Sequence, residues 1–390
     1  MVVRASNDHA NTVIDKSLKA LDAKLTTLVA DIDILNAIGP LNYREQRQLF
    51  FDQHFSVDPQ FVYREHAIDP FLLKRDLFNL PIETIQHPDL YRLYADVIVS
   101  YVDKVDQYKS LGTPEFLYDS LRYYGEPTEK DVRNAQFILH LPQEDLSDEP
   151  VLGAAEIKTL LNDFGQAEGY EYELIEDASM IANALVSGTR VKINSAAEIN
   201  LTDAKALAHH ELGVHLVTTL NGQAQPLKIL SLGCPLNTMT QEGLAIFAEY
   251  QAGFMTVKRL RTLALRVLAV DSMITEKSFR NTFLLLKEQY DVPDQLAFTI
   301  TARVYRGGGF TKDYLYLQGF HKILNLHPQE PNFNRLLVGK TSMNYLPEIS
   351  RLIDEGVFVE PVKMTPAFRE PAVNDGIKQF IAQAIKGTSY

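Results

Sequence analysis

The sequence predicts an α+β protein that is mostly helical, with a small sheet placed directly before one helix of unusual composition. Apolar residues recur at helical spacing over most of the 390 residues, and strand-period alternation is confined to a stretch after Pro150. A chain of this length exceeds what one hydrophobic core usually serves. We therefore expect a helical N-terminal lobe over residues 1–149 and a second domain over residues 150–390 that ends in helices.

The composition excludes several classes of protein. No stretch approaches the roughly 20 apolar residues that cross a bilayer, and the N-terminus lacks the apolar core of a signal peptide, so we expect a cytoplasmic protein without membrane contact. The single cysteine, Cys234, rules out an internal disulfide and zinc sites built from several thiolates. A net charge of -12 argues against nucleic acid as a partner. The oligomeric state stays open.

The N-terminal lobe is predicted to be a series of short helices. The first is expected over residues 11–35, where Gly39 and Pro40 then end the apolar pattern. Further helical patterns continue to about residue 145 and are separated by prolines. Their many Tyr and Phe residues are expected to pack in a core.

After Pro150 the pattern changes from helix to strand and back to helix. Alternating apolar and polar residues indicate strands, and a short Ser-Gly-Thr connection indicates a hairpin. The basic residues of one later helix, Lys258, Arg259, Arg261 and Arg266, are expected on its solvated face. The expected elements are a helix over 157–164, a strand over 170–174, a hairpin over 180–194, a helix from Thr202 or Asp203 to about Leu220, and helices over 238–326 interrupted at Pro293 and at 307–309.

The segment HHELGVH, residues 209–215, places three histidines and a glutamate on one predicted helix, and two of the histidines are candidate metal ligands. In the familiar zinc-protease motif two histidines lie at i and i+4, with a glutamate beside the first to deprotonate a metal-bound water. Here His210 and His215 are five residues apart, which on a regular helix rotates them roughly 140° apart. A single π-type turn would return both to one face, and Gly213 lowers its cost. Glu211 is the candidate general base.

Two histidines leave a catalytic zinc one protein ligand short. The first candidate for the third ligand is Glu242, which lies 27 residues after His215 near the start of the next predicted helix. Glu249 lies one heptad further on nearly the same face. It is the second candidate for the ligand, and otherwise a hydrogen-bond partner for a ligand histidine.

Three motifs carry a resemblance to a known family. The stretches HELGVH, QEGLAIFAEY and RVYRGGGFTKDYLYLQG resemble the tyrosine carboxypeptidases related to the microtubule-associated tyrosine carboxypeptidase, whose bacterial members are described as flavohaemoglobin expression-modulating proteins with a QEGLA motif. The similarity covers about residues 150–355. It implies a mostly helical, zincin-like fold with a small sheet. It also implies Zn²⁺ on His210, His215 and Glu242, with Glu211 as the catalytic acid and base. The eukaryotic relatives remove a C-terminal tyrosine from tubulin.

The third motif offers what an enzyme acting at a peptide or protein C-terminus needs beyond metal. Arg303, Arg306 and Lys312 are cations for a terminal carboxylate, and Tyr314 or Tyr316 is a donor for an oxyanion. The three glycines between them are expected to let the backbone approach substrate closely. Ordinary capping and packing are the structural alternatives for these residues. We assign Lys312 and Tyr316 to catalysis and Arg303, Arg306 and Tyr314 to substrate binding.

Two other functions are compatible with parts of the pattern. Two histidines and one carboxylate also form the ligand set of non-haem Fe(II) enzymes, but iron–oxygen chemistry has no role for Glu211. A non-catalytic regulatory protein that retains the fold would likewise not need this glutamate. A zinc metallopeptidase, specifically a carboxypeptidase, is therefore the function that the sequence favours.

Overall fold

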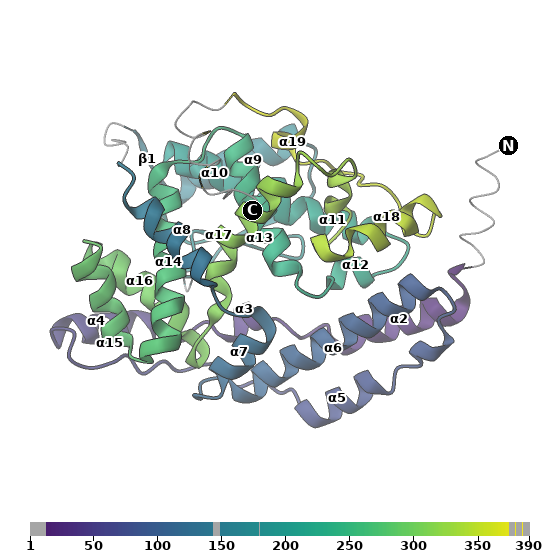
Figure 1. The fold of residues 1–390 in the computed structure, drawn as a ribbon, viewed down its shortest axis with the longest axis horizontal. Coiled ribbons are helices and arrows are strands. Elements are labelled where there is room, and N and C mark those ends of the chain that lie inside the picture. The colour runs from purple at the N-terminus through teal and green to yellow at the C-terminus, as the bar shows by residue number, and fades with distance from the viewer. Residues whose placement is uncertain (1–12, 143–148, 179, 374–378, 380–383, 385–390) are drawn as a thin grey trace.

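The protein is mostly helical, with two small sheets on one side (Figure 1). The structure, a computed structural model, describes residues 13–142, 149–178, 180–373, 379 and 384. No helix within these ranges is both long enough and apolar enough to cross a membrane. The N-terminal helices are α2 (Lys16–Leu28), α3 (Ile34–Ala37), α4 (Tyr43–Asp52), α5 (Pro70–Phe78), α6 (Pro88–Ser110), α7 (Phe116–Tyr124) and α8 (Glu129–Leu139). Helices α2 to α7 lie in the lower part of the molecule in Figure 1, whereas α8 lies above them, against a helix of the second half.

The expected first helix is shorter than the apolar pattern suggested. Helix α2 ends at Leu28, and a separate short helix, α3, begins at Ile34. The side chain of Asp33 accepts a hydrogen bond from Asn36 N at 3.1 Å and so starts α3 as its N-cap. The single helix predicted over 11–35 is thus wrong in its second half, and its first two residues lie outside the described ranges.

The strands form one pair and one three-stranded sheet. Strands β1 (Val151–Gly153) and β5 (Glu198–Asn200), which we did not predict, pair antiparallel. In the second sheet the order is β2-β4-β3, with β2 parallel and β3 antiparallel to β4. The predicted hairpin, formed by β3 and β4, is therefore confirmed, and β3 lies at an edge of this sheet. The strands of the three-stranded sheet are β2 (Glu173–Glu176), β3 (Ala184–Ser187) and β4 (Arg190–Ile193).

The strand predicted over 170–174 begins only at Glu173. The two tyrosines before it pack back on helix α9 (Ala154–Ala167). Tyr170 N donates to Gly165 O at 2.9 Å, and the Tyr172 hydroxyl donates to Leu161 O at 2.8 Å. These contacts close the end of α9, so the alternation of the tyrosines reflects packing on a helix.

The remaining helices confirm the predicted order. The helix bearing the histidines starts earlier than expected, because Asn200 is its N-cap and accepts from Asp203 N at 2.7 Å, where we had predicted Thr202 or Asp203. The series is α10 (Leu201–His210), the π turn η2 (Glu211–Leu216), α11 (Val217–Ala224), α12 (Ile229–Leu232), α13 (Asn237–Gln251), α14 (Val257–Glu276), α15 (Phe279–Leu284), η3 (Leu285–Gln289), α16 (Asp294–Tyr305), η5 (Thr311–Tyr314), α17 (Leu315–Leu326), α18 (Leu346–Asp354) and α19 (Pro366–Arg369).

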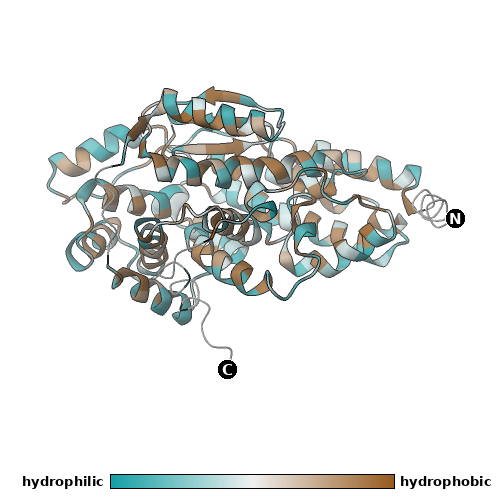
Figure 2. Ribbon diagram, turned by 90° about the horizontal axis from the view of Figure 1, so that it is seen from above, coloured by the Kyte–Doolittle hydropathy of each residue, from teal (hydrophilic) through white to brown (hydrophobic). Residues whose placement is uncertain are grey.

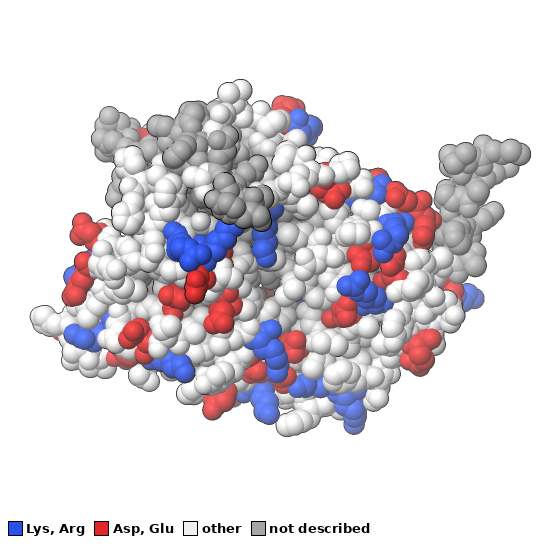
Figure 3. All heavy atoms as spheres, viewed as in Figure 1, with Lys and Arg blue, Asp and Glu red and all other residues white. Residues whose placement is uncertain are grey.

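The largest core is shared between the N-terminal helices and those of the second half. Phe50 of α4 contacts the rings of Phe279 and Phe283, with centroid separations of 5.2 and 5.0 Å. Figure 2 shows hydrophobic and hydrophilic stretches alternating along most helices, as expected when one side of each faces a core. Acidic and basic side chains are mixed over the face drawn in Figure 3.

Candidate metal centre and adjoining basic cluster

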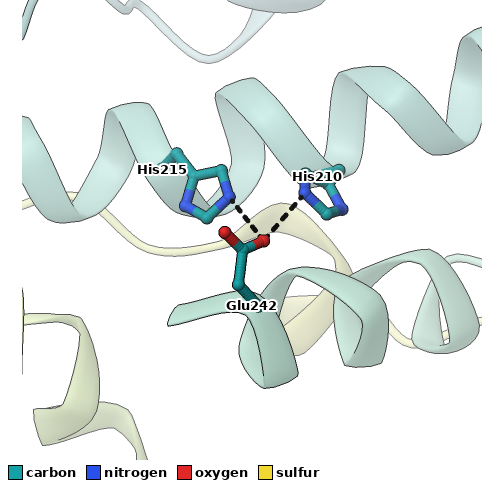
Figure 4. Close-up of side chains that lie close together, drawn as sticks. All are labelled: His210, His215 and Glu242. Atoms are coloured by element: carbon teal, nitrogen blue, oxygen red, sulfur yellow. Dashed lines mark ion pairs between the residues drawn. The ribbon is translucent and has the colours of Figure 1, made fainter. Parts of the chain in front are cut away.

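Two of the three histidines of the HHELGVH segment, His210 and His215, lie on one side of their helix. Residues Glu211–Leu216 form a π turn, which confirms the local geometry that the five-residue spacing required. Figure 4 shows the rings of His210 and His215 directed toward Glu242, which projects from α13. The ring centroids of the histidines are 5.0 Å apart.

Side chains from distant segments satisfy carbonyl groups of the π turn. Gly213 O accepts a hydrogen bond from the Thr365 hydroxyl at 2.7 Å. His215 O accepts from the Thr219 hydroxyl and from Lys340 Nζ, both at 2.8 Å. Burial lowers the pKa of Lys340 to about 8. Because a π turn shifts the regular helical hydrogen bonds by one residue, these extra donors stabilise a geometry that would otherwise leave carbonyl groups without partners.

The three candidate ligands fit a tetrahedral metal ion. His210 Nε2 and His215 Nε2 lie 3.6 and 3.5 Å from Glu242 Oε2, and one ligand atom from each residue lies within 4.8 Å of the others. Zinc bonds of about 2.0–2.1 Å at tetrahedral angles separate ligand atoms by about 3.3–3.4 Å. Glu242 Oε2 is buried and has no hydrogen-bond partner among the described residues. A cation between the three atoms would satisfy it.

Glu249 lies on the opposite side of the His210 ring from Glu242. Its Oε1 is 2.7 Å from His210 Nδ1, and its side chain is 1% exposed. Arg259 donates two hydrogen bonds to the same carboxylate, at 3.0 and 2.9 Å. Burial alone would raise the pKa of Glu249, but Arg259 and His210 outweigh it and lower the pKa to about 2. An ionised Glu249 keeps the proton of His210 on Nδ1, which leaves Nε2 free to bind metal.

Glu211 lies under the free edge of the three-stranded sheet. Its side chain is buried, and its Oε2 accepts a hydrogen bond from Val186 N of β3 at 3.2 Å. Asn194 N donates to Asn183 O at the start of the hairpin. The alternation of an antiparallel pair then turns the backbone groups of Ala184 and Val186 away from β4. The candidate base is thus beside a strand edge whose outward backbone groups are not used by β4.

Lys312, from the third motif, contacts the three candidate metal ligands through Glu242. Its Nζ lies 2.6 Å from Glu242 Oε1 and 2.9 Å from the Tyr316 hydroxyl. Burial opposes the charged form, but Glu242 and the neighbouring groups raise the pKa of Lys312.

Helices α13 and α17 pack closely because Gly243 faces Gly319. A Cβ on Gly243 would lie 2.5 Å from backbone atoms of Gly319.

The arginines of the third motif form a buried cluster with an excess of positive charge. Arg303 makes two hydrogen bonds to Asp313, at 2.6 and 3.0 Å, and Arg266 of α14 approaches the same carboxylate at 3.9 Å. Arg306 lies over the ring of Phe310 at 5.0 Å. The buried Nε atoms of Arg266 and Arg306 have no hydrogen-bond partner among the described residues, although that of Arg266 is the atom that lies 3.9 Å from Asp313. Burial, together with the charge of Arg303, lowers the pKa of each to about 10.

The two tyrosines of the third motif have different surroundings. The Tyr314 hydroxyl donates to Tyr124 O at 2.6 Å, and its side chain is buried against the N-terminal helices. Tyr316 is half-buried beside Lys312, with the guanidinium of Arg266 over its ring at 5.3 Å. The hydroxyl of Tyr316 therefore lies next to Lys312, which in turn contacts the candidate metal ligand Glu242.

Sequence reasoning missed the arginines of α14. We had placed Arg259 and Arg266 on a solvated helix face, which is wrong, because Arg259 binds Glu249 and Arg266 adjoins Asp313. The signal was present in the spacing. These two arginines are seven residues apart and share a face with the buried Leu263.

The comparisons with known proteins agree with the three motifs. A family model described as "Microtubule-associated tyrosine carboxypeptidase" matches residues 48–386. The chain belongs to this family. Relatives named microtubule-associated tyrosine carboxypeptidase 1 are 24% identical over 345 residues in Rattus norvegicus and 25% identical over 330 residues in Homo sapiens. These matches cover 83% and 79% of this chain but only 63% and 60% of the relatives. The family match begins well before residue 150, so it includes most of the N-terminal helices.

Proposed function

We propose that this chain is a zinc-dependent peptidase of zincin-like fold that removes one residue from the C-terminus of a peptide or protein. The observation that carries the proposal is the convergence of His210, His215 and Glu242 near an arginine cluster whose positive charge exceeds that of Asp313, the carboxylate that pairs with Arg303 and Arg266. The family and the names of the relatives support the same reaction, with tyrosine as the residue removed.

Each residue near the cluster has a part in the proposed reaction. Zinc bound there would activate a water and polarise the scissile carbonyl. Glu211 takes the proton of the attacking water and passes it to the leaving amine, since it lies beside the edge strand on which an extended substrate would bind. Lys312 and Tyr316 are placed to donate to the developing oxyanion.

The excess cations account for specificity toward a chain end. Arg303 is held by Asp313 and serves mainly to fix that carboxylate. The Nε atoms of Arg266 and Arg306 have no hydrogen-bond partner among the described residues, and both side chains keep some exposure, so an incoming carboxylate can reach them. A guanidinium offers parallel donors that match a carboxylate. We therefore assign the terminal carboxylate of the substrate to Arg266 and Arg306.

The test compares peptides that differ only at the C-terminus. Purified protein is analysed for metal and incubated with one peptide in free and amidated form, and products are followed by mass spectrometry. We expect about one zinc per chain, release of a single terminal residue, and turnover of the amidated peptide lower by roughly 10- to 100-fold, as expected for a lost charge-assisted hydrogen bond. Internal cleavage, or equal rates on both peptides, would exclude a carboxypeptidase.

A further inference from the structure

The three glycines between Arg306 and Phe310 approach the N-terminal helices more closely than any side chain would allow. A Cβ on Gly307 would lie 2.6 Å from the ring of Phe116, and one on Gly308 would lie 2.2 Å from Thr113 O. All three glycines have positive φ, from 77° to 131°. We had expected these glycines to let the backbone approach substrate closely. They instead approach α7 and the turn before it.

Hydrogen bonds attach both ends of this segment to the N-terminal part of the chain. At one end, Gly307 N donates to the Tyr63 hydroxyl and Gly112 N donates to Gly307 O, both at 2.7 Å. At the other end, Thr311 N donates to Ser120 Oγ at 2.9 Å, and the two side-chain hydroxyls lie 3.2 Å apart. The anchored residues adjoin the functional cations directly. Gly307 follows Arg306, and Thr311 precedes Lys312.

We propose that Tyr63 and Ser120 are positioning residues from the N-terminal part of the chain: Tyr63 fixes Arg306 in the pocket for the substrate carboxylate, and Ser120 fixes Lys312 where it donates to the oxyanion. This inference rests on the proposed function. Three consecutive glycines have wide conformational freedom, so their own sequence does not hold Arg306 in one place. A binding group gains from supports that lock its position before substrate arrives. None of the three clustered metal ligands comes from the N-terminal helices.

The substitution Tyr63→Phe removes the oxygen that accepts from Gly307 N and keeps the ring. The substitution Ser120→Ala removes the acceptor at the other end. For Tyr63→Phe we expect KM for the free-carboxylate peptide to rise about three- to ten-fold, in line with one lost hydrogen bond, with little change in kcat. For Ser120→Ala we expect kcat to fall about three- to ten-fold on free and amidated peptides alike, with little change in KM, because Lys312 serves the oxyanion of both. Turnover of the amidated peptide should stay at the wild-type value in Tyr63→Phe, and the zinc content should stay at the wild-type value in both variants. Tyr118→Phe is the matched control, because Tyr118 lies on α7 with its side chain 62% exposed.

The result separates this inference from the proposed function. If the wild-type protein does not prefer the free peptide, the carboxylate pocket itself is wrong, and no variant is needed to decide it. If the wild type does prefer the free peptide but Tyr63→Phe leaves its KM unchanged, the positioning role of Tyr63 is overturned; an unchanged kcat in Ser120→Ala overturns that of Ser120. An equal loss on free and amidated peptides in Tyr63→Phe, or a loss of zinc in either variant, would also overturn the corresponding role, because either result indicates general damage to the fold.

Discussion

Substitution of Glu249 tests whether this carboxylate orients His210, one of the three candidate metal ligands. In Glu249→Gln the amide oxygen still accepts from His210 Nδ1, but the negative charge beside the ring and opposite Arg259 is lost. Partners of this kind contribute roughly 10- to 100-fold to metal affinity, or about 1.4–2.7 kcal/mol. The contact is short, at 2.7 Å, and almost fully buried, so we expect a loss within this range.

Competition with a fluorescent chelator measures the affinity, and thermal unfolding of the metal-free protein measures damage to the fold. The single variant leaves Arg259 without its carboxylate, so we expect a lower unfolding midpoint as well. Combining it with Arg259→Gln should restore part of the midpoint but not the zinc affinity. Glu176→Gln, an exposed carboxylate on β2, controls for the change in net charge. Wild-type zinc affinity in Glu249→Gln would show that this carboxylate does not orient His210.

Two further predictions concern the base and the π turn. Glu211→Gln should bind zinc normally and lose turnover by orders of magnitude, because an amide cannot accept a proton; peptide cleavage near the wild-type rate, measured by mass spectrometry, would remove Glu211 from the mechanism. Lys340→Met should weaken zinc binding about three- to ten-fold, since His215 O loses one of its two 2.8 Å donors. Unchanged affinity in the chelator assay would show that the hydroxyls of Thr218 and Thr219, which also donate to His215 O, hold the turn without Lys340.

The sequence predicted features that depend on neighbouring residues. A five-residue spacing between His210 and His215, with Gly213 between them, was enough to predict the π turn, because helix geometry relates spacing to direction. The hairpin and most helices followed from periodicity and turn residues in the same way. The split of the first helix did not, since the capping by Asp33 competed with an apolar pattern that continued through it.

Features that depend on long-range packing were beyond the sequence. Arg266 reaches Asp313 only because α14 packs against η5, and Lys340 and Thr365 reach the π turn across more than 120 residues. The fate of Tyr314 was equally hidden. Nothing in its local pattern distinguishes it from Tyr316, yet its hydroxyl bonds to the N-terminal helices and that of Tyr316 does not.

The ion pair between Lys312 and Glu242 gives the ligand carboxylate a permanent counterion inside the protein. A buried carboxylate without a counterion would take up a proton or draw in water if a bound metal left. Here Lys312 of η5 pairs with Glu242 of α13, and α17, which follows η5, contacts α13 where Gly243 meets Gly319. If the site binds zinc as proposed, we therefore expect the metal-free chain to stay folded and to bind the metal again. By the same reasoning, Glu242→Ala leaves the buried ammonium of Lys312 without a counterion. His215→Ala is therefore the better substitution for removing the metal.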